Sequence, residues 1–362
     1  MIRWRKGEVV RIRREWPGAM ELDVAVPGED GPPGGPCRAL AYPSLVGRPE
    51  PGDEVLLNTT ALAMGLGTGG YAMVVAVPNR LPEDPQGPGH LVKARYTPLQ
   101  ATVLGADEQD SPHHETLREA DSVDGMPVVV ADLHSALAPI LCGLYADAGH
   151  EVRVAYVMLD GGALPAWFSM SAAALRERGW LAGTVTVGQA FGGDVEAVTT
   201  HTGLLAARHV LGADVAIVAQ GPGNLGSGTR WGFSGVSAGE AVNAASVLLG
   251  RPVAALRVSE GDRRERHYGV SHHSLTAYGR VALARARVPV PMLPGEFGER
   301  VRDQAESLAV RHELVPVGVD GLHEALRASP VRLSTMGRGL EEDLAYFLAS
   351  AAAGRLAASL LS

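Results

Sequence analysis

The sequence predicts an α/β protein in two parts: a small β-rich N-terminal domain, either a barrel or a sandwich, and a larger doubly wound domain with a mostly parallel sheet. Three observations lead to this prediction. The chain has 362 residues, which is too long for one ordinary hydrophobic core and suits two domains. Short β-rich runs fill the chain to about residue 100, and from Met126 onward valine-rich runs alternate with helical patterns.

The N-terminal part contains runs of strand composition separated by Gly, Pro and Asp turns. These runs cover residues 7–16, 19–28, 37–44, 53–61 and 70–79. Residues 80–90 hold three prolines and two glycines, which predicts a loop or linker. We therefore expect a β-rich domain at 1–100, a connecting segment at 101–125 and an α/β domain at 126–362.

The α/β part contains up to eight apolar runs, each followed by a helical pattern. They cover residues 127–134, 151–159, 181–188, 213–220, 251–259, 287–293, 312–319 and 330–336. Because the runs lack polar alternation, they are typical of parallel strands buried on both faces. A closed (β/α)₈-like barrel is the alternative, but uneven units and long Gly-rich loops favour an open sheet with a crevice.

The last segment, residues 340–361, predicts an amphipathic helix packed on the α/β domain. A partner helix in a dimer is its alternative interpretation, so a homo-oligomer stays open.

Composition excludes several classes of protein. The formal charge of −8 disfavours nucleic acid as a partner. No apolar run reaches the roughly 18 residues that suggest a membrane span, and the N-terminus lacks a signal-peptide core, so we expect a soluble cytoplasmic protein without a membrane partner. The two cysteines, Cys37 and Cys142, are too few and too far apart for a disulfide framework or a Cys-rich metal site.

A glycine-rich segment follows the run at 213–220, where the carboxyl end of a strand is expected. Glycines there let backbone N–H groups turn toward an anion, and Arg230 can clamp a phosphate or carboxylate. The segment is neither a Walker A loop nor a GxGxxG dinucleotide fingerprint, so the cofactor is unknown. A long flexible connection is the alternative. The predicted ligand-binding residues are Gly221, Gly223, Asn224, Gly226, Gly228, Thr229 and Arg230.

Five histidines are candidates for acid–base work. His113 and His114 lie among carboxylates before the α/β domain. Binding of a divalent metal is an alternative for this pair, although its spacing matches no metal motif, and a capped helix start also explains it. His134 ends the first buried run. His272 and His273 open a helix, where neighbouring side chains point in different directions, so we expect one to face a cleft while the other packs or caps. We assign no residue as a metal ligand.

Two basic segments have open interpretations. Lys93 and Arg95 either belong to a strand with exposed basic side chains or contact an anion from the crevice between the domains. The run at 263–267 is interpreted as a solvated loop, with a local anion clamp as the alternative. No GxSxG motif supports a hydrolase nucleophile.

Several long segments together resemble an uncharacterised bacterial family, domain of unknown function 3866. The resemblance rests on LNTTALAMGLGTGGYAMVVA, GPGHLVKARYTPLQ, EQDSPHHE, GVSHHSLTA and the block of residues 187–235, and it covers nearly the whole chain. It implies no activity.

A more distant resemblance is to the proprotein subunit of glycine, betaine and proline reductases, which also has a β-rich front and an α/β body. In that subunit a cysteine after the third body strand becomes a pyruvoyl group by self-cleavage. The matching residues here, 186–193, have no Cys, Ser or Thr after Val187, so the resemblance implies a scaffold without that chemistry.

These observations lead to two main hypotheses about function. One is an enzyme that binds a small anionic metabolite in the crevice between the domains, with the Gly-rich loop holding the anion and a histidine moving protons. The alternative is a non-catalytic ligand-binding or scaffold protein descended from a reductase-subunit-like enzyme. A nucleotide-binding protein is a third possibility, and whether the protein is an enzyme at all is left undecided.

Overall fold

The computed structural model describes residues 1–27, 36–66 and 69–361. The chain forms two compact units, one of residues 1–88 and 92–102, the other of residues 89–91 and 103–362. Among the described residues, no helix combines the length and the hydrophobicity that crossing a membrane requires.

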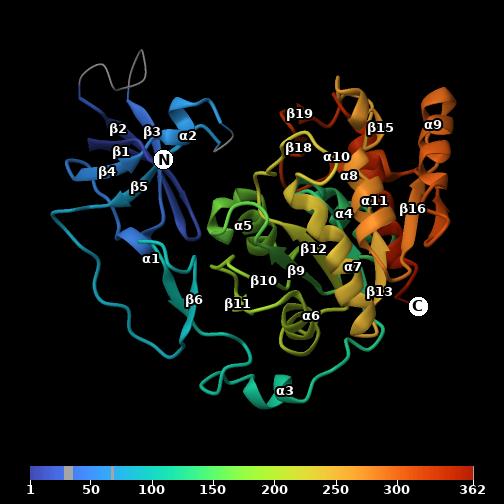
Figure 1. Ribbon diagram of the computed structural model, residues 1–362, viewed down its shortest axis with the longest axis horizontal. Coiled ribbons are helices and arrows are strands. Elements are labelled where there is room, and N and C mark those ends of the chain that lie inside the picture. The colour runs from blue at the N-terminus through green and yellow to red at the C-terminus, as the bar shows by residue number, and fades with distance from the viewer. Residues whose placement is uncertain (28–35, 67–68, 362) are drawn as a thin grey trace. The chain divides into compact units, whose positions relative to one another are not determined.

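The first unit is a closed barrel with strand order β1-β2-β3-β5-β4 (Figure 1). Its strands are β1 (Trp4–Trp16), β2 (Ala19–Ala25), β3 (Cys37–Ala41), β4 (Glu54–Asn58) and β5 (Ala72–Ala76), with short helices α1 (Pro43–Val46) and α2 (Thr60–Ala63). The long β1 closes the barrel because it pairs with β2 and with β4, and two register shifts bend it. All five predicted strands are present, and the barrel rather than the sandwich is confirmed.

Side chains of β2 point alternately into the barrel and away from it, so the strand has one apolar and one charged side. Met20, Leu22 and Val24 point into the apolar interior. Glu21 and Asp23 point the other way and are buried beneath arginines of β1 and β3. Burial alone would raise the pKa of Glu21, but hydrogen bonds from Arg38 and Arg14 outweigh it and leave this pKa below its usual value.

The second unit is built on an open eight-stranded sheet with order β11-β10-β9-β12-β8-β13-β16-β17. Every adjacent pair is parallel, which confirms the predicted doubly wound sheet and excludes the closed (β/α)₈ barrel. The strands are β8 (Pro127–Val130), β9 (Val154–Leu159), β10 (Gly183–Thr186), β11 (Val195–Glu196), β12 (Val215–Gln220), β13 (Arg251–Ala254), β16 (Arg287–Pro291) and β17 (Glu313–Val317).

Helices cover both faces of this sheet (Figure 1). α4, α10 and α11 form one layer, while α6 and α7 pack on the other face. The helices are α3 (His114–Arg118), α4 (Leu137–Ala148), α5 (Met170–Glu177), α6 (Thr200–His209), α7 (Ser237–Val247), α8 (His272–Thr276), α9 (Gly295–Glu306), α10 (Leu322–Arg327) and α11 (Leu344–Ala358). A π-helical turn, Ala277–Val281, continues α8.

Three two-stranded sheets complete the secondary structure: β6 (Leu91–Lys93) with β7 (Ala101–Val103), β14 (Val258–Ser259) with β15 (Gly269–Val270), and β18 (Ser334–Thr335) with β19 (Arg338–Gly339).

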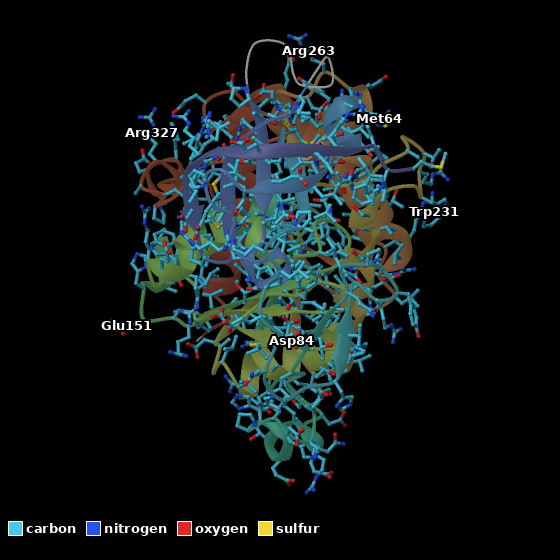
Figure 2. All side chains as sticks on the ribbon, turned by 90° about the vertical axis from the view of Figure 1, so that its left-hand side faces the viewer. Met64, Asp84, Glu151, Trp231, Arg263 and Arg327 are labelled. Carbon is cyan, nitrogen blue, oxygen red and sulfur yellow. The ribbon has the colours of Figure 1, made fainter. Side chains whose placement is uncertain are left out.

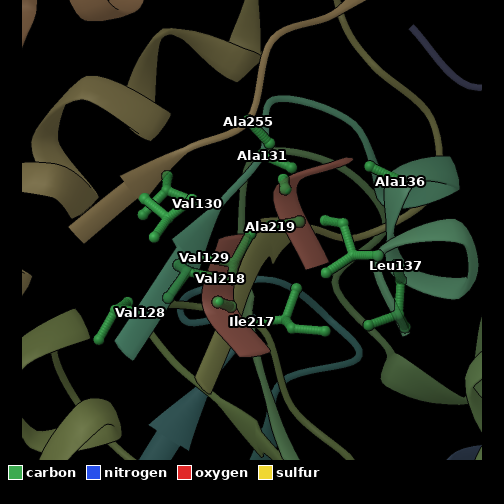
Figure 3. Packing of buried hydrophobic residues seen from close by; sticks show 14 of the residues in the cluster. Val128, Val129, Val130, Ala131, Ala136, Leu137, Ile217, Val218, Ala219 and Ala255 are labelled. Carbon is green, nitrogen blue, oxygen red and sulfur yellow. The ribbon is translucent and has the colours of Figure 1, made fainter. Parts of the chain in front are cut away.

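The centre of the sheet is fully apolar. Val129 of β8 and its neighbour Ile217 of β12 face Leu137 at the start of α4, whereas Val128, Val130 and Val218 point to the opposite face of the sheet (Figure 3). This burial on both faces is the physical reason for the uninterrupted valine runs in the sequence.

The C-terminal helix differs from the expectation. Residues 340–361 are predicted to form an amphipathic helix, but twelve of the fifteen residues of α11 are buried, so the helix has no broad polar face. It lies so close to α4 that a Cβ on Gly143 would stand 1.9 Å from the carbonyl oxygen of Ala351. The small alanine side chains of α11 therefore let neighbouring segments pack closely against several sides of the helix.

Candidate functional site

The strand order creates a switch point between β8 and β12. From β8 the chain leaves through α4 toward β9, and from β12 it leaves through α7 toward β13, in the opposite direction along the sheet. Right-handed crossovers then place α4 and α7 on opposite faces, so the loops after β8 and β12 separate. In open α/β sheets such a point is where ligands usually bind.

The loop after β12, residues 221–236, is a folded hairpin rather than a flexible connection. Gly226 and Phe233 form an antiparallel bridge, and the Ser227 N–H donates to the Gly232 carbonyl at 2.7 Å. Asn224 accepts from Gln220 at 2.9 Å, and Thr229 accepts from the backbone of Gly232 at 3.2 Å. These two predicted ligand-binding side chains are therefore engaged in holding the loop.

Its glycines have separate roles. Gly221 packs against Ala163, where a Cβ would stand 2.5 Å from the carbonyl oxygen. Gly223 and Gly228 have φ values of 91° and 81°, a region that favours glycine. The guanidinium of Arg266 lies against Gly228, with its nitrogens 3.8 and 3.9 Å from the position of a Cβ.

A pocket of about 690 Å³ opens beside this loop and extends along α8, the π-helical turn and the end of α9. Three arginines from three segments line it: Arg230, Arg266 and Arg280. None of them forms an ion pair or side-chain hydrogen bond with a residue that the structure describes. The full lining is Gly228, Arg230, Arg266, His272, Leu275, Thr276, Gly279, Arg280, Ser307 and Leu308.

Three histidine rings meet beside this pocket, and one of them, His272, lines it. The β14–β15 pair closes the loop between Ser259 and Gly269, which returns His267 to the start of α8 beside His272 and His273. Ring centroids lie 4.4 Å apart for His272 and His273, 4.9 Å for His267 and His273, and 5.0 Å for His267 and His272. One ring nitrogen from each lies within 4.8 Å of the other two. As expected of adjacent helix positions, His272 lines the pocket while His273 packs against Phe233, although ring nitrogens of the two still approach each other.

Each of the three rings has different partners. The Nδ1 atom of His267 lies 2.8 Å from the hydroxyl of Ser271, which also caps α8. His273 stacks on Phe233 at 3.8 Å, and its Nδ1 accepts from Arg257 at 3.2 Å. Nε2 of His272 is buried without a hydrogen-bond partner among the described residues, although the residue itself lines the pocket.

Burial keeps the imidazoles of His267 and His272 neutral. It lowers the pKa of His267 to about 3, assisted by the positive charges of Arg257 and Arg264. It lowers the pKa of His272 to about 4, assisted by His273 and Arg266. Neutral imidazoles accept protons and bind metal ions, which protonated ones cannot do.

Buried charges lie beneath the histidines. Arg257 is only 4% exposed and lies 3.9 Å from Asp132 and 4.0 Å from Asp262. Oδ2 of Asp132 lies 3.7 Å from Nδ1 of His273 and has no hydrogen-bond partner among the described residues. Bidentate hydrogen bonds from Arg264, at 2.9 and 2.6 Å, hold the pKa of Asp262 well below its usual range.

His134 lies at the switch point but does not line the pocket. Tyr156 donates its hydroxyl hydrogen to the Gln220 carbonyl at 3.0 Å, so Nδ1–H of His134 donates to the phenol oxygen, also at 3.0 Å. Nε2 then accepts from the Ser169 hydroxyl at 2.7 Å. Burial lowers the pKa of His134 to about 4. The result is a fixed Ser–His–Tyr chain.

The other predicted site residues lie elsewhere. His114 begins α3 and His113 directly precedes it. Figure 1 shows α3 at the bottom of the second unit and α8 in its upper part, so the two histidine pairs do not share a site. Nδ1 of His114 lies 2.8 Å from the carbonyl oxygen of Asp107. Lys93 is buried in the first unit, so it is not the exposed strand residue expected. The Arg95 guanidinium lies 5.6 Å from the ring of Tyr96.

Sequence reasoning missed several residues of the site. Arg280 lies in a helical pattern and gives no local signal. Asp132 and Arg257 do give one, because each is a charged residue directly after an apolar run that forms a buried strand. Arg266 and His267 fall in the basic run at 263–267, and Arg266 lines the pocket as the clamp interpretation of that run requires.

Fold and site together define a class: an α/β protein with a closed β-barrel unit and an open parallel sheet, carrying an arginine-lined pocket with a histidine cluster beside it. The chain belongs to the family described as protein of unknown function (DUF3866), whose model matches residues 38–354. No curated protein and no solved structure shows significant similarity to it.

Proposed function

We propose that the protein binds a small anionic metabolite in the pocket bordered by Arg230, Arg266 and Arg280. The observation that carries the proposal is the convergence of these three guanidinium groups, none of them ion-paired with a described residue. Unpaired cations on three separate segments repel one another, and an anion between them reverses that repulsion. Arginine suits phosphate and carboxylate because its planar donors bind both in a bidentate manner.

The volume of the pocket and the residues that line it also limit the size and chemistry of the ligand. A volume of about 690 Å³ is in the range of small-molecule sites and exceeds what a bare phosphate fills. Leu275 and Leu308 supply an apolar wall, and Thr276 and Ser307 supply hydroxyls. A phosphorylated or carboxylated metabolite with a modest apolar part fits this combination, in a bacterial cytoplasmic protein as the sequence predicts.

If the protein is an enzyme, we propose that His272 transfers protons in its reaction. Of the five predicted proton-transfer histidines, it is the one that lines the pocket, and in the metal-free protein its neutral ring can accept a proton from a bound ligand. A screen of phosphorylated and carboxylated metabolites for turnover, with His272→Gln as the comparison, tests this step.

The second candidate is a non-catalytic scaffold descended from a reductase-like subunit, and residues 186–193 favour it. Thr186 donates to Glu196 at 2.6 Å, and Gln189 N–H donates to Asp160 at 2.8 Å, so the turn is well held but has no nucleophile after Val187. Intact-mass measurement of the purified chain should show no self-cleavage. A cleaved chain carrying a pyruvoyl group would contradict this candidate.

Calorimetric titration of the metal-free protein with inorganic phosphate and pyrophosphate tests the binding proposal. Arg230→Ala and Arg266→Ala should each weaken binding about 10- to 100-fold, since a hydrogen bond to a charged group contributes about 1.5–3 kcal/mol. Arg263→Ala is the matched control. It removes one positive charge from the loop that carries Arg266, but Arg263 points outward and does not line the pocket (Figure 2). Equal affinity in all four proteins, or no binding to any, would overturn the proposal.

An exposed tryptophan offers a second measurement. Trp231 follows Arg230 directly and projects from the hairpin loop (Figure 2). Pyrophosphate should therefore change the fluorescence of the wild-type protein, and Trp231→Phe should remove that change without altering the calorimetric affinity.

A further inference from the structure

We propose that His267, His272 and His273 form a three-histidine site for a divalent transition metal of the zinc class. These are the residues whose ring nitrogens converge, and they come from two segments that the β14–β15 pair holds together. The metal site is a separate inference from anion binding, and only its coupling to the pocket rests on the proposed function.

The hydrogen bonds leave the same atom available on each ring. Nδ1 of His267 is engaged by Ser271, and Nδ1 of His273 is engaged by Arg257, so Nε2 is the free nitrogen of both. Nε2 of His272 is buried and has no partner among the described residues. A buried polar atom without a hydrogen bond is costly, and a metal ion satisfies it.

The distances between the histidine nitrogens suit a metal ion once the rings move slightly closer together. In a tetrahedral site with metal–nitrogen bonds of about 2.0–2.1 Å, the nitrogens stand about 3.4 Å apart. One nitrogen of each ring lies within 4.8 Å of the other two, so that set of nitrogens needs to close by at most about 1.4 Å. The proposal takes the ligand atom of each ring to be Nε2, because the hydrogen bonds occupy Nδ1 of His267 and His273. Imidazole ligands suit zinc and its neighbours, whereas calcium and magnesium prefer oxygen.

Asp132 completes the arrangement as an outer-shell carboxylate. Metal ligands of this kind usually donate their second ring N–H to a carboxylate or carbonyl. When Nε2 of His273 binds the ion, its proton relocates to Nδ1, which then gives up the hydrogen bond from Arg257 and donates toward the unpartnered Oδ2 of Asp132, 3.7 Å away. Asp132 and Asp262 together also offset the charge that the ion adds beside Arg257.

Three protein ligands leave a fourth coordination position open. Phe233 covers one face of His273, and Ser271 and Arg257 lie against the cluster, so the side toward the pocket, which His272 lines, is where this position opens. An anion held by the arginines can then also bind the metal. Metal and anion should each raise the affinity of the protein for the other by the same factor.

Titration of chelator-treated full-length protein with Zn²⁺ in phosphate-free buffer tests the site. We expect one ion per chain, and Co²⁺ as a substitute should give the visible spectrum of a four-coordinate ion. His272→Gln and His267→Gln should abolish tight binding. Asp132→Asn should weaken it about 10- to 100-fold, as outer-shell changes do. His113→Gln, a histidine outside the cluster, is the control, and circular dichroism verifies that each variant is folded.

Zinc affinity equal in wild type and His272→Gln, or a six-coordinate Co²⁺ spectrum, would overturn the metal site. Phosphate binding by metal-free protein is measured separately, so the two proposals fail independently: loss of zinc binding with retained phosphate binding removes only the metal site, and the reverse result removes only the anion pocket. Added phosphate that leaves zinc affinity unchanged would refute the open position toward the pocket.

Discussion

Replacing Gly143 by alanine should destabilise the second unit, although alanine is the better helix former. Gly143 lies inside α4, and its missing side chain lets the backbone of α11 approach. An ideal Cβ there would stand 1.9 Å from the carbonyl oxygen of Ala351, and one on Gly354 would stand 1.9 Å from that of Ile140. The two glycines thus form both sides of one close helix crossing.

The size of the effect follows from two opposing contributions. Real Cβ atoms essentially never come closer than 3.0 Å to another heavy atom, so the helices must separate by at least about 1.1 Å. Because α11 is buried almost all round, it has little room to move, and overpacking of this kind costs about 3 kcal/mol. Alanine returns about 1 kcal/mol of helix propensity. We therefore expect a net loss of about 2 kcal/mol.

Thermal unfolding followed by far-ultraviolet circular dichroism at the helical minimum measures this loss. In the first unit the described helices, α1 and α2, have four residues each, so the helical signal reports the second unit. A loss of about 2 kcal/mol corresponds to a fall in Tm of roughly 4–8 °C for a unit of this size.

Gly318→Ala is the matched control, because a Cβ there meets nothing within 4 Å and its φ is not positive. It should stay within about 0.5 kcal/mol of wild type. If Gly143→Ala were as stable as wild type or more stable, direct backbone contact between α4 and α11 would be refuted.

Three further predictions concern buried polar groups. The pKa of His134 is lowered to about 4 from 6.5, so the unfolded chain binds the proton more tightly and stability should fall as pH drops from 6.5 toward 4; His134→Gln should flatten this dependence in urea titrations, and an unchanged slope would contradict the neutral ring. Burial raises the pKa of Cys142 to about 11 and that of Cys37 above its usual value, so a chromogenic disulfide reagent should label both thiols only after unfolding, and rapid native labelling would refute their burial. Arg257→Met should cost about 3–5 kcal/mol by leaving buried carboxylates without their cation. Asp132→Asn added to it should recover part of that loss in urea denaturation, and no recovery would show that the two are not coupled.

Most of the fold was predictable because strand periodicity and burial act locally. Seven of the eight apolar runs form strands of the main sheet. The eighth, residues 330–336, contributes only Ser334–Thr335 to the small β18–β19 sheet. The strand in its place, β11, has two residues and pairs with β10 at Val185 and Thr186. Nothing in so short a segment distinguishes it from a loop, since tertiary pairing alone defines it.

The site was predictable only in part, for a different reason. Gly228, Arg230 and His272 were chosen because strand ends are where ligands bind, and all three line the pocket. The placement of Arg280, and of His267 beside His272, depends on a π-helical turn and on a two-stranded ribbon. Such features arise from packing between distant segments, so one sequence without relatives does not show them.

The π-helical turn after α8 determines which residues face one another. It contains a bond from the Ala282 N–H to the Ala277 carbonyl, five residues back, where an α-helix would use four. Each α-helical residue advances the direction of side chains by about 100°, so one extra residue rotates everything after it relative to everything before it. His272 precedes the turn and Arg280 lies within it, yet both line the same cavity. In a chain one residue shorter at this point, an uninterrupted α-helix would turn the Arg280 guanidinium away from the His272 imidazole, so the length of the chain here decides whether the two side chains share one cavity.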